Sequence, residues 1–393
     1  MSEKRDRGKK PRILFISNYY LPGYKRGGGL RTVANIVERF KDRFDFLIIT
    51  RDHDGDKITY PSVKVDKWNE VKGAEVFYLP QNKIKLSKLR ELIVDVKPDS
   101  IYLNSVFSTL SIFLLILRKL KKIPLTKIVL APQGELSDGA LQLKASKKKL
   151  FINFAKSTGL YRNIIWKMTT ELEKEETQRF EQRGAEYFIA ADIPSRQLLE
   201  NYREDLKPKK NVGQVKTVFL SRFMRKKNFK WLAENLSDIR GDLEIDIIGP
   251  LEDKDYWDET MSVIKKLPAN VKVEYKGEVE YERVMEKLSE YHFLILPTLG
   301  ENFGHVFIEA LAAGCPLIIS DRTPWLSLEE KAIGWDIPLE SPQKWLEKLN
   351  YCINLDNVTY SKLSANARGF ASQWLSKSEI EEDTLRVLKY SLK

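Results

Sequence analysis

Cysteine and histidine are scarce in this chain of 393 residues. Two cysteines, Cys315 and Cys352, are too few for a disulfide framework or a four-cysteine zinc site, and they fit a reducing compartment. The three histidines, His53, His292 and His305, are too scattered along the sequence for a histidine-rich metal site. The sequence therefore predicts neither a disulfide scaffold nor a bound metal.

Long apolar runs are also missing. The longest run, Val106–Leu117, contains two serines and a threonine, whereas a membrane-spanning helix needs about 20 apolar residues. The charged start of the chain lacks the apolar core of a signal peptide. We expect a cytoplasmic protein, with peripheral contact to the inner face of the cell membrane left open.

Positive charge is concentrated in the first half of the chain. Residues 1–200 hold 38 Lys and Arg against 24 Asp and Glu, a surplus of 14, and residues 201–393 hold 28 against 31, a deficit of 3, which together give the net +11. Such a surplus suits nucleic acid, an anionic membrane or a phosphorylated ligand. No nucleic-acid partner is expected, because no aromatic residues interleave with the basic stretches and no binding module is recognisable.

Short apolar strands alternate with amphipathic helices along the chain. This alternation predicts an α/β protein whose parallel sheets are covered by helices on both faces. The lysine-rich segment Asn201–Gln214 is typical of a linker. We expect two tandem Rossmann-like, doubly wound domains facing across a cleft, at 1–204 and 205–375, and a C-terminal helix in 376–393 that packs back on the first domain.

The predicted strands begin and end with the apolar runs. In the first half they are Ile13–Ile16, Phe46–Ile49, Val76–Leu79, Ile101–Leu103, Ile128–Leu130 and Tyr187–Ala190, and in the second half Val218–Leu220, Ile245–Ile248, Val271–Tyr275, Phe293–Leu296 and Leu317–Ile319. The predicted helices include Leu30–Phe40, Lys88–Val96, Asn228–Leu236, Tyr256–Lys266, Glu280–Ser289, Val306–Ala313 and Ser378–Leu388. Ligands bind beyond the carboxyl ends of the strands in such sheets, so residues that follow strands are the candidates.

Three glycines, Gly27–Gly29, precede the first predicted helix. Glycine lets the backbone approach a ligand closely, and the free N–H groups of a helix start can bind phosphate. A plain tight turn explains them equally well, and the spacing is not that of a dinucleotide fingerprint.

In the second half, Arg222 and Lys227 follow the first strand, where they could neutralise a diphosphate leaving group. The alternative there is a solvated basic turn.

The segment from Leu296 to Pro316 is the most informative. A strand ends, and a glycine-containing turn leads into a helix that starts near Gly304. The backbone N–H groups at that start could bind phosphate, a helix carboxylate could accept two ribose hydroxyls, and a loop carboxylate could reach a sugar ring. The alternative for His305 is simple capping of the helix. The candidate residues of this segment are Glu301 for catalysis and Asn302, Phe303, Gly304, His305 and Glu309 for ligand binding.

In their order, these motifs resemble family 4 retaining glycosyltransferases, which have the B-type fold of two Rossmann domains (GT-B). The resemblance rests on the Glu-x7-Glu pair Glu301 and Glu309, the R-x4-K pair Arg222 and Lys227, the glycine turn Gly249-Pro250 and the loop Gly27–Gly29. It covers almost the whole chain. It implies sugar transfer from a nucleotide-diphosphate sugar, UDP- or GDP-linked, with retention of configuration and without metal or other cofactor.

The resemblance also implies roles for single residues. Arg222 and Lys227 would stabilise the leaving diphosphate, helped by Gly28, Gly29 and the helix start at Phe303–His305. Glu309 would hold the ribose, and Glu301 would bind the transferred sugar. Asn104, Gln133 and Glu135, which follow strands of the first half, would line the acceptor side, although Glu135 fits a surface-loop carboxylate equally well.

A softer resemblance concerns bacterial enzymes that build surface glycans such as O-antigen or capsule. It rests on Ala131–Lys144 with Lys147–Lys149, and on Arg51–Asp54 with Tyr60-Pro61. The acceptor would be a glycan or a lipid-linked sugar. Gln133 stands where relatives often have arginine and Lys167 where many have histidine, which leaves the sugar and the acceptor open.

Other interpretations of the chain remain. The basic and apolar stretches Lys144–Phe154 and Leu114–Lys122 suit an anionic membrane surface, or are core-facing helices with solvated lysines. The acidic run Asp52–Asp56 is expected to be a solvated loop, because Lys57 and Val63 stand where a calcium loop needs Gly and Glu.

Alternative functions are a non-catalytic nucleotide-sugar-binding protein, a nucleotide-sugar epimerase of the same fold, or a phosphorylase, for which no pyridoxal-binding lysine is evident.

Overall fold

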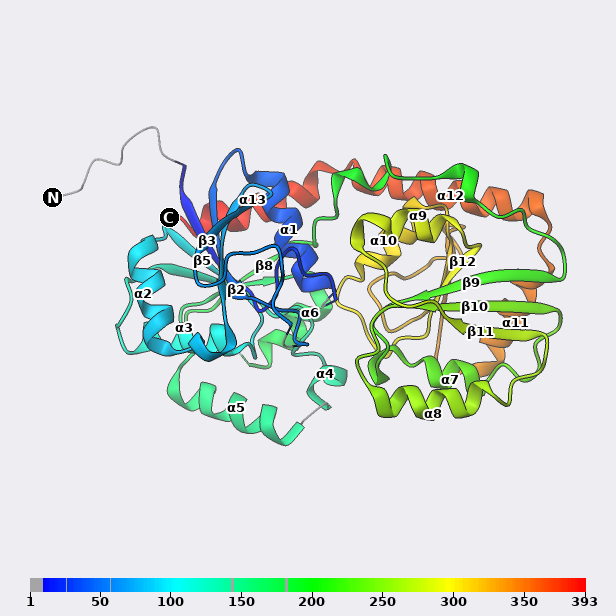
Figure 1. The fold of residues 1–393 in the computed structure, drawn as a ribbon, viewed down its shortest axis with the longest axis horizontal. Helices are drawn as coiled ribbons and strands as arrows, with labels where there is room; N and C mark the ends of the chain where they lie inside the picture. The colour runs from blue at the N-terminus through cyan, green and yellow to red at the C-terminus, as the bar shows by residue number, and fades with distance from the viewer. Residues whose placement is uncertain (1–9, 26, 57, 143–144, 181–182) are drawn as a thin grey trace. The chain divides into compact units, whose positions relative to one another are not determined.

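The chain forms two compact units in this computed structural model, which describes residues 10–25, 27–56, 58–142, 145–180 and 183–393 (Figure 1). The first unit comprises Met1–Ile193 and Ser378–Lys393, and the second comprises Pro194–Lys377. The first unit therefore ends ahead of the expected linker Asn201–Gln214.

The first unit is built on an eight-stranded sheet in the order β3-β4-β2-β1-β5-β6-β7-β8. All pairs are parallel except β3 with β4. The order reverses between β1 and β5, which makes that pair the topological switch point. The strands are β1 Arg12–Ile16, β2 Asp45–Arg51, β3 Trp68–Val71, β4 Ala74–Leu79, β5 Ser100–Asn104, β6 Lys127–Ala131, β7 Ile165–Met168 and β8 Glu186–Ile189.

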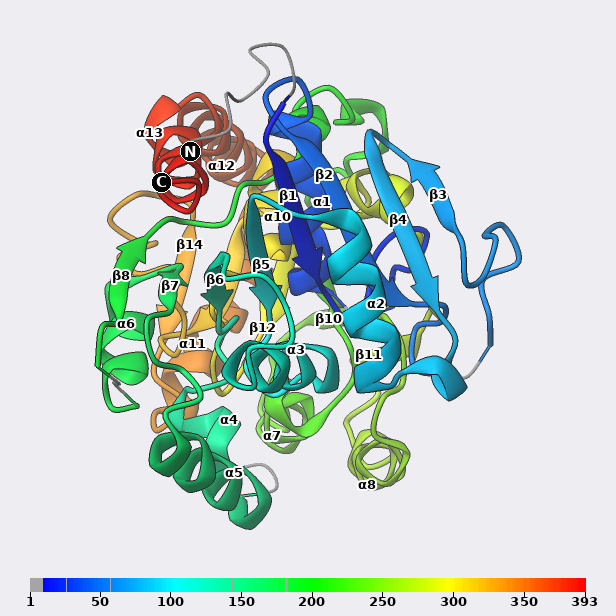
Figure 2. The same ribbon diagram turned by 90° about the vertical axis from the view of Figure 1, so that its left-hand side faces the viewer.

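Helices cover both faces of this sheet because both faces are apolar. Alternate residues of β1 point to opposite sides: Ile13 and Phe15 belong to one buried cluster, and Leu14 and Ile16 belong to the other. Figure 2 shows α2 and α3 in front of the sheet and α1 behind it. The helices of this unit are α1 Gly28–Phe40, α2 Leu86–Val96, α3 Thr109–Lys119, α4 Asp138–Gln142, α5 Ala145–Thr158, α6 Glu171–Gln178 and α13 Ser378–Tyr390.

The C-terminal helix α13 packs on the first unit through both apolar and polar contacts. Val387 and Leu388 join the cluster on the α1 face. Ser100 Oγ donates a hydrogen bond to Ser391 Oγ over 2.6 Å, and Arg39 of α1 forms an ion pair with Glu381. The end of the chain is thus part of the first unit's core.

The second unit has a six-stranded, fully parallel sheet in the order β11-β10-β9-β12-β13-β14. Its order reverses between β9 and β12. The strands are β9 Gln214–Leu220, β10 Asp242–Ile248, β11 Val271–Tyr275, β12 Phe293–Leu296, β13 Leu317–Ser320 and β14 Gly334–Ile337. The helices are α7 Phe229–Glu234, α8 Lys254–Ile264, α9 Val284–Ser289, α10 His305–Ala312, α11 Pro342–Asn354 and α12 Asn357–Leu375.

The α/β prediction with two parallel sheets is confirmed, and three strands were not predicted. These are β3, β7 and β14, which are short and carry polar residues. In β7, Lys167 is buried and its Nζ lies 2.6 Å from Asp192 Oδ1. Burial, the largest single influence, lowers the pKa of Lys167, but Asp192 together with Tyr102 and Glu173 holds this pKa above its ordinary value. The cation is thus neutralised inside the fold.

The prediction of a solvated loop at Asp52–Asp56 is wrong for its first three residues. Asp52, His53 and Asp54 are all buried. The Asp54 carboxylate accepts hydrogen bonds from the Tyr24 backbone N–H at 3.0 Å and from the Tyr60 hydroxyl at 2.9 Å. The buried carboxylates are therefore satisfied by donors within the first unit.

Candidate functional site

The predicted donor-binding residues lie together at the switch point of the second sheet. Arg222 follows β9 and Glu301 follows β12, and these two strands are neighbours at which the order reverses. Ligands of doubly wound sheets bind outside the carboxyl ends of such a pair. The sequence-predicted residues of the second half thus gather where the fold places a ligand.

Lys227 and Glu301 form a buried ion pair that joins the loops after β9 and β12. Their side chains are only 11% and 13% exposed. The backbone supports the pair, because the Leu299 N–H donates to the Lys226 carbonyl at 2.8 Å. Burial lowers the pKa of Lys227 and would raise that of Glu301, but Lys227, Lys226 and Arg222 together hold the pKa of Glu301 below its ordinary value. The site therefore contains a carboxylate kept ionised by a cluster of cations.

Arg222 forms a second, more exposed ion pair. Its Nη1 lies 2.7 Å from Glu252 Oε2, and the two side chains are 33% and 27% exposed. Glu252 follows the turn Gly249-Pro250 after β10. The Phe223 N–H donates to the Pro250 carbonyl at 2.8 Å and the Glu252 N–H to the Phe223 carbonyl at 3.1 Å. These bonds lock the turn after β10 against the loop that carries Arg222.

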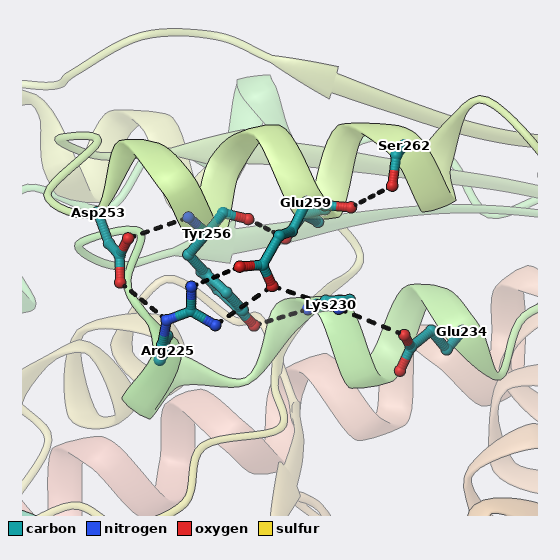
Figure 3. A network of polar contacts seen from close by, with 8 residues as sticks. Arg225, Lys230, Glu234, Asp253, Tyr256, Glu259 and Ser262 are labelled. Carbon is teal, nitrogen blue, oxygen red and sulfur yellow. Dashed lines mark hydrogen bonds and ion pairs between the residues drawn. The ribbon is translucent and has the colours of Figure 1, made fainter. Parts of the chain in front are cut away.

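Arg225 anchors the same loop to helix α8 (Figure 3). Its guanidinium binds Glu259, with Nη2 at 2.6 Å from Oε1, and Asp253, with Nε at 3.3 Å from Oδ2. It also lies over the Tyr256 ring at 5.2 Å from the centroid. Lys230, in the following helix, pairs with Glu259 as well. The backbone between Arg222 and Lys227 is therefore held from the side of α8.

The start of α10 is fixed by aromatic packing. Gly304 caps the helix with φ 76°, a left-handed conformation that glycine adopts without strain. The Trp325 Nε1–H donates to the Phe303 carbonyl at 2.6 Å, and the Phe303 ring packs on Trp374 with centroids 5.6 Å apart. The backbone around Asn302 and Gly304 is thus rigidly placed beside the loop of Glu301.

His305 and Glu309 occupy buried positions on the first two turns of α10. His305 is 8% exposed and Glu309 is 6% exposed. The His305 ring contacts the Phe303 ring, with centroids 5.0 Å apart. Glu309 brings a carboxylate to the inner side of α10, in the same unit as Glu301 and Lys227.

The three acceptor-side candidates lie at the ends of β5 and β6 in the first unit: Asn104 is the last residue of β5, and Gln133 and Glu135 follow β6. Asn104 Nδ2 donates to the carbonyl of Gly29 at 2.8 Å, which ties the end of β5 to the start of α1 and to Gly28. Gln133 adopts φ 55° just after β6. Glu135 accepts hydrogen bonds from Ser105 Oγ at 2.8 Å and from the Val106 N–H at 2.7 Å, so its carboxylate fixes the loop after β5.

The sequence interpretation missed Glu252 and Arg225. The signal for Glu252 was its place directly after the turn Gly249-Pro250, beyond the end of a strand. Arg225 looked like one more cation of a basic turn.

Among the residues that the structure describes, no three His, Cys, Asp or Glu side chains gather in a way that could hold a metal ion. Both cysteines are buried, and burial raises the pKa of the Cys315 thiol to about 12.

Replacing Gly249 with alanine should destabilise the second unit strongly. Its added Cβ would lie 2.1 Å from the Ser221 carbonyl oxygen, and its φ is 137°. Gly277 is the matched control, because its φ is +82° but nothing lies within 4 Å of an added Cβ. We expect G277A to cost about 1 kcal/mol and G249A more than about 3 kcal/mol in urea unfolding. Equal costs would show that the close approach to Ser221 does not matter.

Comparison with known proteins places these features in context. Residues 202–370 match the family model described as "Glycosyl transferases group 1". No match is found among curated proteins. The match lies within the second unit, which is therefore similar to this family over most of its length.

Solved structures similar to the chain extend over both units. HepE of Anabaena, crystallised with UDP and glucose, is 15% identical with a TM-score of 0.65, over 97% of this chain and 100% of that one. Sucrose-phosphate synthase of Thermosynechococcus elongatus is 16% identical with a TM-score of 0.70, over 97% and 98%. WaaG, a glycosyltransferase involved in lipopolysaccharide biosynthesis, is 14% identical with a TM-score of 0.63, over 94% and 98%. The chain therefore has the GT-B fold, as its motifs predicted.

Proposed function

We propose that the chain is a retaining, metal-independent glycosyltransferase of family 4. It moves a sugar from a UDP- or GDP-linked donor to a glycan or lipid-linked acceptor in the synthesis of a bacterial surface polysaccharide, of the O-antigen or capsule type. The observation that carries the proposal is the meeting of Arg222, Lys227 and Glu301 at the switch point of the second sheet. The domain match over residues 202–370 supports it.

The chemistry follows from where the charges lie. As the bond between sugar and diphosphate breaks, negative charge grows on the leaving phosphate and positive charge on the sugar ring. Arg222 and Lys227 stabilise the phosphate, and the ionised Glu301 stabilises the ring. Positive groups of the protein fill the role that a metal ion would take. Glu309 holds the ribose hydroxyls, and the backbone N–H groups at Phe303–His305 hold phosphate oxygens.

The acceptor binds to the first unit in this proposal. Asn104 ends β5 and Gln133 follows the neighbouring parallel strand β6, so both residues lie at the same edge of the sheet. Gly28 and Gly29, which begin α1 at the switch point of that sheet, belong to the donor side and help to hold the diphosphate. Glu135 acts through the loop after β5, which it holds by its hydrogen bonds to Ser105 and Val106.

A nucleotide diphosphate should raise the melting temperature of the wild-type protein. A ligand at 100 times its dissociation constant stabilises by about 2.7 kcal/mol, a shift of several degrees. We expect UDP or GDP, among UDP, GDP, ADP and CMP, to give this shift. The isosteric variant E309Q should lose most of it, because the neutral amide accepts ribose hydroxyls less strongly.

The control for that measurement is E290Q, which neutralises a carboxylate paired with Lys287 on α9. It should keep the full shift. If no nucleotide shifts the wild type, the donor assignment fails. Binding without sugar transfer would favour a non-catalytic binding protein, and conversion of the donor without acceptor would favour an epimerase.

The transferred sugar should keep its anomeric configuration, and transfer should proceed in EDTA. We expect the anomeric proton coupling in the product to match that of the donor, by NMR. The rate should be unchanged by EDTA, because Arg222 and Lys227 supply the positive charge. Inversion, or loss of activity restored by Mg²⁺ or Mn²⁺, would contradict the proposal.

The first unit also has a surface that suits an anionic membrane. On α5, Lys147 and Lys149 are exposed beside Leu150 and Phe154, which are 73% and 51% exposed. Leu120 at the end of α3 is 59% exposed, and Lys119 donates to the Thr158 carbonyl at the end of α5, so the two helix ends adjoin. Lys144, in the same predicted stretch, lies outside the described residues. Within the described part of the chain, no helix is both long and apolar enough to span a bilayer.

Anionic vesicles should therefore carry the protein in flotation experiments at low salt. Each lysine near an anionic surface contributes about 1 kcal/mol, and buried apolar side chains add to this. The double variant L150S/F154S should float several-fold less. The control L326S/V358S removes two exposed apolar side chains of the second unit and should float like the wild type. If the wild type does not float with anionic vesicles, the membrane proposal is wrong.

A further inference from the structure

The guanidinium of Arg222 is held by a carboxylate that lies outside all the motifs predicted to bind the donor. The pair Arg222–Glu252 links residues 30 positions apart, and the two groups meet at 2.7 Å. A diphosphate that binds Arg222 would compete with Glu252 for the guanidinium, whose Nη1 donates to Glu252. The pair is therefore a direct competitor of the ligand that the proposed function assigns to Arg222.

The backbone around this pair is fixed, so the exchange involves side chains. The Phe223 N–H and carbonyl bond to Pro250 and Glu252, and an isolated parallel bridge joins Phe223 to Leu251. Gly249 approaches Ser221 too closely to admit a side chain. Arg225 holds the other end of the loop on α8. The backbone that carries Glu252 is thus fixed beside the loop of Arg222.

The two ion pairs of the site differ in how easily they exchange. Lys227 and Glu301 are almost fully buried, so separating them would leave two charges without water or partner. Arg222 and Glu252 are about one-third exposed, and ion pairs exposed to this extent contribute little to stability. Water can replace either partner. Arg222 is consequently the cation that can change partners.

We propose that Glu252 is the resident counter-ion of Arg222 and sets the affinity for the donor's diphosphate. Glu252 orients the guanidinium in the empty site, gives it up when the diphosphate binds, and then repels the diphosphate as a nearby like charge. It weakens binding of the diphosphate and leaves the nucleoside part unaffected. The inference rests on the proposed function, since it takes Arg222 as a diphosphate ligand.

The test is calorimetric titration of UDP, GDP and the two nucleosides into the wild type, E252Q and E290Q. E252Q should bind the preferred nucleotide about fivefold more tightly at low salt, and the gain should shrink at high salt. Its nucleoside affinity should not change. E290Q is closely matched, because Lys287 and Glu290 are also 2.7 Å apart and both 29% exposed, and it should bind like the wild type.

A double-mutant cycle with R222Q separates a charge effect from a structural one. In the R222Q background, E252Q should gain much less than in the wild type, because the shared guanidinium is gone. Equal or weaker nucleotide binding by E252Q, with wild-type binding intact, would overturn the role of Glu252 alone. If the wild type binds neither UDP nor GDP, the proposed function falls and this inference falls with it.

Discussion

The buried ion pair of Lys227 and Glu301 is the contact on which the site of the second unit depends. Neither charge could be buried alone, because an isolated ion in a protein interior costs several kcal/mol. The loop after β9 therefore requires the loop after β12, and each fixes the other at the edge where the sheet order reverses. Backbone bonds from Leu299 to Lys226 add a second connection. The ion pair thus positions the two loops at the carboxyl ends of β9 and β12.

The two cations of the site divide the work between rigidity and exchange. Lys227 forms an ion pair with Glu301 that has little exposure to solvent, so the position of its charge is fixed. Arg222 is wetter and sits on a loop whose backbone is held by Arg225 and by the turn at Gly249. A preorganised charge stabilises a transition state without reorganisation, whereas an exchangeable one lets substrate enter and product leave. Under the proposed function, both properties would serve a site that binds and releases a diphosphate.

Much of the fold could be predicted from apolar runs, and the misses have physical reasons. The eleven predicted strands were recognisable because buried parallel strands are continuously apolar. β7 was not predicted because Lys167 interrupts its apolar run. The charge of this buried lysine is compensated by Asp192, which is 25 positions away. β3 is an antiparallel edge strand with little buried surface. In the site, the position after a strand was enough to single out Arg222, Lys227 and Glu301. The pairing of these charges was not predictable, because Glu252 and Glu301 lie 30 and 74 positions away from the cations that they hold.

Burial, more than sequence position, decides what each charge of this chain can do. Asp52 and Asp54 look like a solvated acidic loop in the sequence, yet they are buried and accept hydrogen bonds within the first unit. Lys167 counts toward the basic surplus of the first half, yet Asp192 cancels its charge in the interior. The exposed lysines, such as Lys147 and Lys149 on α5, are the ones that contribute positive electrostatic potential at the surface. The proposed contact with an anionic surface therefore depends on exposed lysines such as those of α5, and Lys167 does not contribute to it.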